Sequence, residues 1–213
     1  MDSGEVFAIP NCFIISFTDE SRHAHTRVRR VPSHGNDVAL LTELNAFCRA
    51  VSADPPPLEE AARQVEELCR SHPTYPVWGI LLAYIVGGGA YTLFFGGGLW
   101  DALCGGLCGL AIGLSIQLMK HLRANAFIRT LVCGAASALC ALLLTRFGPG
   151  EHLDLIIIGA LMILVPGIAF TNSIRDVMCG DFTSGVSGAV EAMLTAVAIA
   201  LGTGFVLSLG WAI

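Results

Sequence analysis

Five polar or charged residues stand close together in the otherwise apolar second half of the chain. They are Asn172, Arg175, Asp176, Asp181 and Glu191. An arginine guanidinium binds a carboxylate through two parallel hydrogen bonds, and a carboxyl group held among apolar residues is by default a candidate for proton transfer. This combination predicts a pathway for a small acidic substrate and for a proton. In that interpretation Arg175 attracts the substrate carboxylate, and Glu191 or Asp181 carries the proton.

The charges at Arg175 and Glu191 also allow a purely structural interpretation. A buried ion pair of Arg175 with Glu191 or with Asp176 would only hold the loop in place. Glu191 shares a predicted helical face with Gly188, where it can meet the side of the preceding loop that carries Arg175. The sequence leaves both interpretations open.

A Pro-Gly pair precedes these residues. Proline lacks a backbone donor and clashes with the preceding helical turn, and glycine weakens a helix, so Pro166 and Gly167 should break the fourth apolar segment near its inner end. Non-helical backbone at membrane depth is tolerated only when it is buried in protein or lines a water-filled cavity. Transporters place binding sites at such interruptions. We therefore expect this pair to act as a hinge.

Other polar residues in the apolar half carry weaker signals. Asp101 stands at the outer start of the second apolar segment, where capping a helix is the more usual role of a carboxylate. The motifs HExxH, GxSxG and the P-loop are missing, and the sequence from Met178 to Asp181 lacks the first glycine of the GxGD pattern of intramembrane aspartyl proteases. The sequence therefore predicts a protein that is not an enzyme.

The eight cysteines occur singly, without CxxC pairs or partner histidine clusters. The closest pair, Cys104 and Cys108, has helical spacing within an apolar run. Cysteine in such places behaves as a small hydrophobic residue. We expect reduced packing residues, no bound metal or other cofactor, and no nucleic-acid partner.

Composition divides the chain into two parts that suit different solvents. Of 213 residues, 54% are hydrophobic and only 14% are charged, against roughly 25% charged in an average soluble domain. Residues 1–76 hold seven arginines and eleven acidic residues, whereas 77–213 hold only five basic and six acidic ones. The sequence predicts a small soluble α+β domain at 1–76 followed by an all-α polytopic membrane domain at 77–213.

The soluble part should contain a strand hairpin and two amphipathic helices. Strand-forming residues fill 6–17 and return at 26–31, and apolar residues recur at helical spacing after Asp37 and again over 58–70. So few large apolar groups make a thin core. The arginines at 27, 29 and 30 suit either an anionic lipid or substrate, or simply a solvated strand face.

Five stretches come near the length of roughly 20 residues that crosses a bilayer. They are 77–95, 99–119, 127–145, 153–170 and 184–212. With the N-terminal domain in the cytoplasm, eleven of the twelve basic residues lie inside, as the positive-inside rule requires. The N-terminus lacks the basic start and apolar run of a cleavable signal peptide. We therefore expect a cytoplasmic N-terminus and a C-terminus outside.

Two predicted spans carry rows of small residues, which let helices approach closely. The second span has Gly105, Gly109 and Gly113, and the fifth has small residues at spacing four. The fifth-span row is Gly188, Ala192, Ala196, Ala200 and Gly204. These rows favour bundle packing over a pore lining, either within one chain or in a homo-oligomer, and membrane lipid covers the remaining apolar surface.

The spacing of the polar residues resembles a known family pattern. Read from Pro166 to Glu191, the sequence fits PG-x4-N-x2-RD-x3-GD-x2-SG-x5-E of the threonine/serine exporter (ThrE) family, with Ser184 and Gly185 in the SG position. More closely, the whole chain resembles the YjjP-type half-subunits of that family. The sequence from Gly97 to Asp101 that enters the second span is part of this resemblance.

The resemblance implies a subunit of a secondary transporter in a bacterial inner membrane. Fused members export threonine and serine, and the split pair, in which a YjjB-type protein supplies the second membrane half, exports succinate. That second half is missing from this sequence, and so is the amphipathic helix that usually precedes the first strand, which implies a shortened N-terminus. The alternative function is a scaffold or regulatory membrane subunit that binds no substrate itself.

Overall fold

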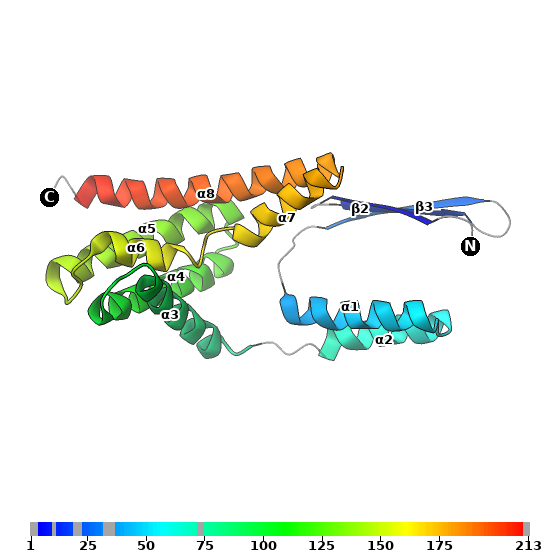
Figure 1. Ribbon diagram of the computed structural model, residues 1–213, viewed down its shortest axis with the longest axis horizontal. Helices are drawn as coiled ribbons and strands as arrows, with labels where there is room; N and C mark the ends of the chain where they lie inside the picture. Colours follow the sequence, from blue (N-terminus) through cyan, green and yellow to red (C-terminus); the bar gives the residue numbers. More distant parts are fainter. Residues whose placement is uncertain (1–3, 10–11, 19–22, 32–36, 72–74, 211–213) are drawn as a thin grey trace. The chain divides into compact units, whose positions relative to one another are not determined.

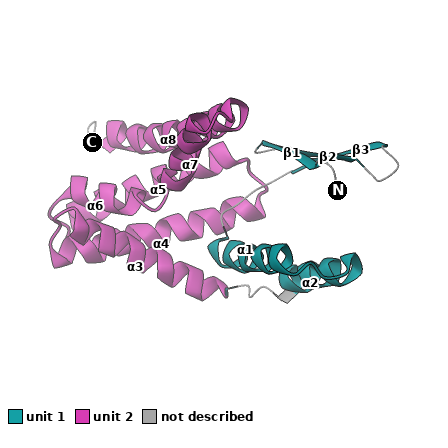
Figure 2. Ribbon diagram, turned by 45° about the vertical axis from the view of Figure 1, so that its right-hand side comes forward, with its two compact units in different colours: residues 1–75 teal, residues 76–213 magenta. Residues whose placement is uncertain are grey.

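The structure is a computed structural model that describes residues 4–9, 12–18, 23–31, 37–71 and 75–210. The chain divides into two compact units, Met1–Tyr75 and Pro76–Ile213, which Figure 2 shows in different colours. The first unit contains a small sheet and two helices, and the second contains only helices.

The sheet of the first unit is a three-stranded antiparallel meander (Figure 1). Its strands are β1 (Gly4–Ile9), β2 (Cys12–Thr18) and β3 (Ala24–Arg30), with β2 in the middle. The prediction of a two-stranded hairpin is therefore wrong in one respect, because 6–17 forms two strands. Pro10 and Asn11, between these two strands in the sequence, lie outside the described residues.

Two helices complete the first unit, and both confirm the expected positions. Helix α1 (Val38–Ala53) begins after Asp37, whose Oδ1 accepts a hydrogen bond from the Leu40 N–H at 3.1 Å. Helix α2 (Leu58–Ser71) follows a short proline-rich connection. None of the described residues of this unit is buried, which agrees with the expected thin core.

The second unit contains six helices among the described residues. They are α3 (Val77–Phe94), α4 (Leu99–His121), α5 (Ala126–Phe147), α6 (Leu153–Leu161), α7 (Gly167–Met178) and α8 (Phe182–Gly210). In the described part of the chain, α3, α4, α5 and α8 are long and apolar enough to cross a membrane. The expected span at 153–170 is not one continuous helix but parts of two short ones, α6 and α7.

Glycines set the close packing of α3 on α4. A Cβ added at Gly109 would collide with the backbone oxygen of Tyr84, and one added at Gly88 would collide with the backbone oxygen of Gly105. The two backbones therefore touch directly, which only glycine permits. The expected glycine row of the second span is thus a packing face, and it is directed at α3.

The small-residue row of α8 is only partly used for packing. Gly188 and Ala192 lie in the α7-facing half, where Gly188 is half-buried and Ala192 is buried. Farther along, α8 turns a different face to α5, since a Cβ at Gly202 would collide with the Leu131 backbone oxygen. The remaining row members, Ala196, Ala200 and Gly204, are exposed.

A core cluster fills the space between α4, α5 and α6. Three buried cysteines, Cys104, Cys108 and Cys133, belong to it together with Ile112 and Ile156. All eight cysteines are free thiols. The expectation of packing cysteines holds for these three, whereas Cys48, Cys69 and Cys179 are exposed.

Candidate functional site

The chain is interrupted between α6 and α7, directly before Gly167. Helix α6 ends at Leu161, the next five residues are not helical, and α7 begins at Gly167 with Pro166 as its N-cap. Proline is favoured at the start of a helix, where its missing N–H has no intrahelical partner to lose. The break predicted from the Pro-Gly pair is therefore present, and it begins earlier than expected, at Met162.

The interruption transfers the chain from one packing partner to another. Helix α6 packs against α3, α4 and α5, whereas α7 packs against α8. Figure 1 shows α6 and α7 following one another within the second unit, with the turn to α8 at the far end of α7. Residues 162–166 thus join a tightly packed group of helices to a helical hairpin.

Helices α7 and α8 meet through small residues. A Cβ on Gly185 would lie 2.5 Å from Val177 Cγ2 and 2.7 Å from the Ser173 backbone oxygen. A Cβ on Gly188 would collide with Ser173 Oγ, and Ser173 itself is buried. Gly185 therefore has a packing role, which the family pattern alone does not reveal.

The turn between α7 and α8 brings several of the predicted site residues together. Gly180 adopts a φ of 96°, a conformation that favours glycine. The Asp181 N–H then donates to the Asp176 carbonyl oxygen at 2.9 Å, and Ser184 Oγ lies 3.5 Å from Asp176 Oδ2. Asp176 and Ser184 are half-buried in this turn.

The other predicted site residues have exposed side chains. Asn172 and Arg175 lie one turn apart on α7, Asp181 lies in the turn, and Glu191 lies two turns into α8. No ion pair among the described residues joins Arg175 to Glu191 or to Asp176, so the buried pair considered from the sequence is not formed. The polar groups are instead displayed on the surface of the α7–α8 hairpin.

Asp101 occupies a different environment at the start of α4. Its side chain is only 1% exposed. Oδ2 accepts from the Gly98 N–H at 3.1 Å, as the expected helix cap does, while Oδ1 accepts from the N–H groups of Glu151 and His152 at 2.8 and 3.1 Å. Asp101 therefore also fastens the connection between α5 and α6 to α4.

His152 completes this arrangement, and sequence reasoning does not single it out. Its Nδ1 lies 2.9 Å from Asp101 Oδ2, which raises the pKa of His152 above its ordinary value through the hydrogen bond and the nearby negative charge. The signal that could have found it is its position directly before an apolar segment, at the same end of the bundle as Asp101.

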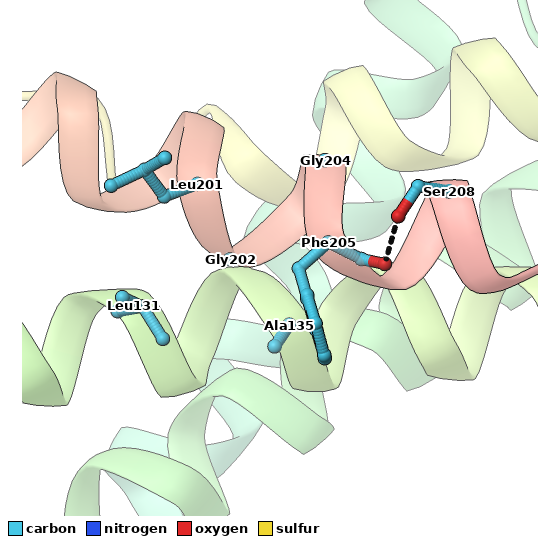
Figure 3. A pocket seen from close by; sticks show the side chains of 7 residues that line it. All are labelled: Leu131, Ala135, Leu201, Gly202, Gly204, Phe205 and Ser208. Carbon is cyan, nitrogen blue, oxygen red and sulfur yellow. Dashed lines mark hydrogen bonds between the residues drawn. The ribbon is translucent and has the colours of Figure 1, made fainter.

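Open apolar grooves run along α8. One of about 530 Å³ lies between α5 and α8, and Figure 3 shows Leu131, Ala135 and Phe205 among its lining residues. Another of about 410 Å³ lies beside the interruption, between Pro166 and the exposed small residues Ala200 and Gly204. The exposed part of the small-residue row therefore borders the broken helix.

The polar side chains of the α7–α8 hairpin are of types that can bind an anionic ligand and exchange protons. One arginine, one amide and three carboxyl groups lie on or beside a hairpin that follows an interrupted helix. Guanidinium and amide groups recognise carboxylates through hydrogen bonds, and carboxyl groups exchange protons. The first-turn N–H groups of α7 add donors beside the break.

Comparison with known proteins agrees with the family pattern. The family described as "Putative threonine/serine exporter" (ThrE) matches residues 1–210. Similar curated proteins are named "Pheromone-regulated membrane protein 10": the Candida albicans (strain WO-1) protein is 29% identical over 99% of this chain, and those of Debaryomyces hansenii and Eremothecium gossypii are 25% and 26% identical over 97% and 96%. No solved structure matches.

This chain spans only a small part of the length of these relatives. This chain covers 19% of the Candida albicans protein, 20% of the Debaryomyces hansenii protein and 28% of the Eremothecium gossypii protein. The family match, by contrast, takes in residues of both units and all the helices that the structure describes. The chain is therefore a membrane protein that belongs to the threonine/serine exporter (ThrE) family.

Proposed function

We propose that this chain is one subunit of a secondary transporter that exports a small polar metabolite bearing a carboxylate. The observation that carries the proposal is the interruption between α6 and α7, followed by polar residues on α7 and α8. Helix breaks with polar groups beside them are the usual substrate and ion sites of transporters. The description of the matched family supports threonine and serine as substrates, and the resemblance to the split half-subunits adds a succinate-like dicarboxylate.

Helices α6 and α7 together form the fifth crossing in this proposal. They span 153–178, and their combined length at 1.5 Å per residue is about 30 Å, the thickness of a bilayer core. With five crossings and a cytoplasmic N-terminus, the C-terminus lies outside. The placement in a bacterial inner membrane rests on the half-subunit pattern alone, since the relatives named above are yeast proteins.

The predicted site residues of the α7–α8 hairpin have separate roles. Arg175 attracts the substrate carboxylate, with Asn172 one turn away as a hydrogen-bonding neighbour. Glu191 or Asp181 carries the coupled proton, and Asp176 with Ser184 and Gly185 holds the turn. Pro166 and Gly167 provide the hinge. A ligand that touches α7 can thus turn it at the interruption relative to α6.

A second membrane half completes the transporter. Several candidate residues are exposed in the single chain, and a substrate path needs protein or water around its polar groups. A YjjB-type subunit, which the sequence resemblance implies, is the proposed partner. The alternative is a scaffold role, in which the partner alone binds the substrate.

Efflux from proteoliposomes tests the proposal. The chain is reconstituted with its partner subunit, the vesicles are loaded with succinate, threonine or serine, and efflux is measured under a proton gradient. We expect Arg175→Ala and Glu191→Gln to lower efflux at least tenfold. Matched controls are Arg146→Ala and Glu67→Gln, which alter exposed residues of α5 and α2 and should leave efflux unchanged.

Two outcomes would contradict the proposal in different ways. Unchanged efflux in both α7–α8 variants would overturn the residue roles. Substrate binding by the partner alone, with none by this chain in the presence or absence of the partner, would establish the scaffold role instead.

A further inference from the structure

The end of the second unit that carries Asp101 holds a group of titratable residues outside the proposed substrate path. Asp101 comes from the first turn of α4, and Glu151, His152 and Asp154 come from the connection after α5 and the first turn of α6. The α7–α8 turn lies at the opposite end of the bundle, as Figure 1 shows within the second unit. This group therefore needs an explanation of its own.

The contacts of Asp101 show what the group holds together. Its carboxylate accepts two N–H bonds from the α5–α6 connection and one from the turn before α4, and His152 Nδ1 bonds the same carboxylate at 2.9 Å. The Asp101 side chain is 1% exposed, whereas that of His152 is 56% exposed. The buried Asp101 carboxylate is thus linked to solvent through the imidazole ring of His152.

We propose that Asp101 and His152 form a proton-binding latch that holds the α5–α6 connection against the start of α4. When His152 is protonated, an ion pair adds to the hydrogen bonds. When it is neutral, the backbone hydrogen bonds remain and the ion pair is lost. The latch is therefore tighter at low pH and looser at high pH. This proposal does not depend on transport or on any substrate.

The charges around His152 favour the protonated ring. Asp101 faces it from α4, Glu151 precedes it in the chain, and Asp154 lies in the first turn of α6, so that all three acidic groups attract the same proton. Because the ring is more than half exposed, solvent screens these attractions. A modest response to pH is expected, spread over the range in which histidine titrates.

Cys104 provides a built-in reporter of the latch. It lies on α4 one turn after Asp101 and is only 1% exposed. A Cβ added on Gly150 would lie 3.3 Å from Cys104 Sγ, so the α5–α6 connection passes close to this thiol. Loosening of the connection should admit a water-soluble thiol reagent to Cys104.

The experiment measures labelling of Cys104 by a methanethiosulfonate reagent in a chain whose other cysteines are replaced by alanine. Rates are taken from about pH 5 to about pH 9 and divided by those of the exposed Cys179 in a matching single-cysteine chain. Thiol reactivity itself changes with pH, so the decisive comparison is with His152→Gln, which keeps a hydrogen-bond donor but cannot titrate. His121→Gln, at the other end of α4, is the control.

We expect the normalised rate to rise with pH roughly two- to fivefold more with His152 present than in His152→Gln, the range of a screened ion pair. His121→Gln should behave like the natural chain. Asp101→Asn should raise labelling at every pH. Identical pH courses for the natural chain and His152→Gln would overturn the proposal.

A second measurement keeps the proposal testable if the cysteine-depleted chain does not fold. The ring protons of His152 are followed by NMR in the full chain, with His152→Gln to assign them. We expect a pKa for His152 above the ordinary histidine value of 6.5, because of its bond to Asp101. A pKa for His152 at or below 6.5 would contradict the latch.

Discussion

The prominent polar side chains of helices α3 to α6 and those of the α7–α8 hairpin lie in different surroundings. In the first group, Thr92 and Asp101 are almost fully buried, and each has a hydrogen bond within the protein. In the hairpin, Asn172, Arg175 and Glu191 have exposed side chains. A buried polar group whose hydrogen bonds are made has a structural role, whereas an exposed polar group in an otherwise apolar region is a candidate for function. This contrast supports the proposed division, with scaffolding in the first group and ligand handling in the hairpin.

Close glycine contacts occur within both regions, whereas the connection between the two regions is not helical. Glycines bring the backbones of α3 and α4 into direct contact, which leaves little freedom for sliding. The hairpin is tied to the core through α8 on α5 and through the interruption after α6. Motion is therefore easier at the interruption than between α3 and α4.

Removal of the Asp101 carboxylate should have the largest effect on stability. Asp101→Ala leaves the N–H groups of Glu151 and His152 without their acceptor, and each such loss in a buried site costs about 1–3 kcal/mol. We expect a loss of about 3 kcal/mol in unfolding free energy in detergent. Asp181→Ala, at an exposed position, should change it by less than about 0.5 kcal/mol. Equal losses in the two variants would remove the distinction between the regions.

A methyl group added at a glycine contact between α3 and α4 should have the second-largest effect on stability. Gly109→Ala places a methyl group against the Tyr84 carbonyl and should cost about 1–3 kcal/mol, as overpacking does. Gly204→Ala is the matched control, because nothing lies within 4 Å of its added Cβ. Thermal unfolding of both variants checks this difference. A Gly109→Ala protein as stable as Gly204→Ala would show that α3 and α4 are not held by close contact.

The pH dependence of stability should be the smallest effect. The pKa of His152 is raised in the folded protein by its bond to Asp101, so the stabilisation is complete below the ordinary value of 6.5 and is lost as the pH rises through the folded-state pKa. The difference in melting temperature between the natural chain and His152→Gln should therefore shrink from about pH 5 to about pH 9. A difference that grows with pH would reverse the sign and contradict the assignment.

Much of this division could be predicted from the sequence. Apolar length located α3, α4, α5 and α8, and the Pro166–Gly167 pair located the break, because backbone chemistry at proline is local. The polar residues of α7 and α8 stood out because they interrupt apolar runs. The same local reasoning placed the cap of α1 at Asp37.

The rest depends on contacts between residues far apart in the chain. Asp101 and His152 are separated by about fifty positions, and no local pattern pairs them. The row of small residues on α8 looked uniform in sequence, yet only part of it is covered, since α8 changes its packing partner along its length. The fourth apolar segment was expected to break only near its inner end, whereas α6 already ends at Leu161, because hydropathy does not show where a helix stops.

The central claim is that the interruption between α6 and α7 is the working part of the membrane domain. It is tested most directly by the double variant Pro166→Ala, Gly167→Ala, which allows α6 to continue toward α7. Nothing lies within 4 Å of a Cβ added at Gly167, so the change at that position is sterically free. Efflux of the transported metabolite is measured in proteoliposomes together with the melting temperature. The account predicts a protein as stable as the natural chain with efflux lowered at least tenfold, and natural efflux in the double variant would contradict it.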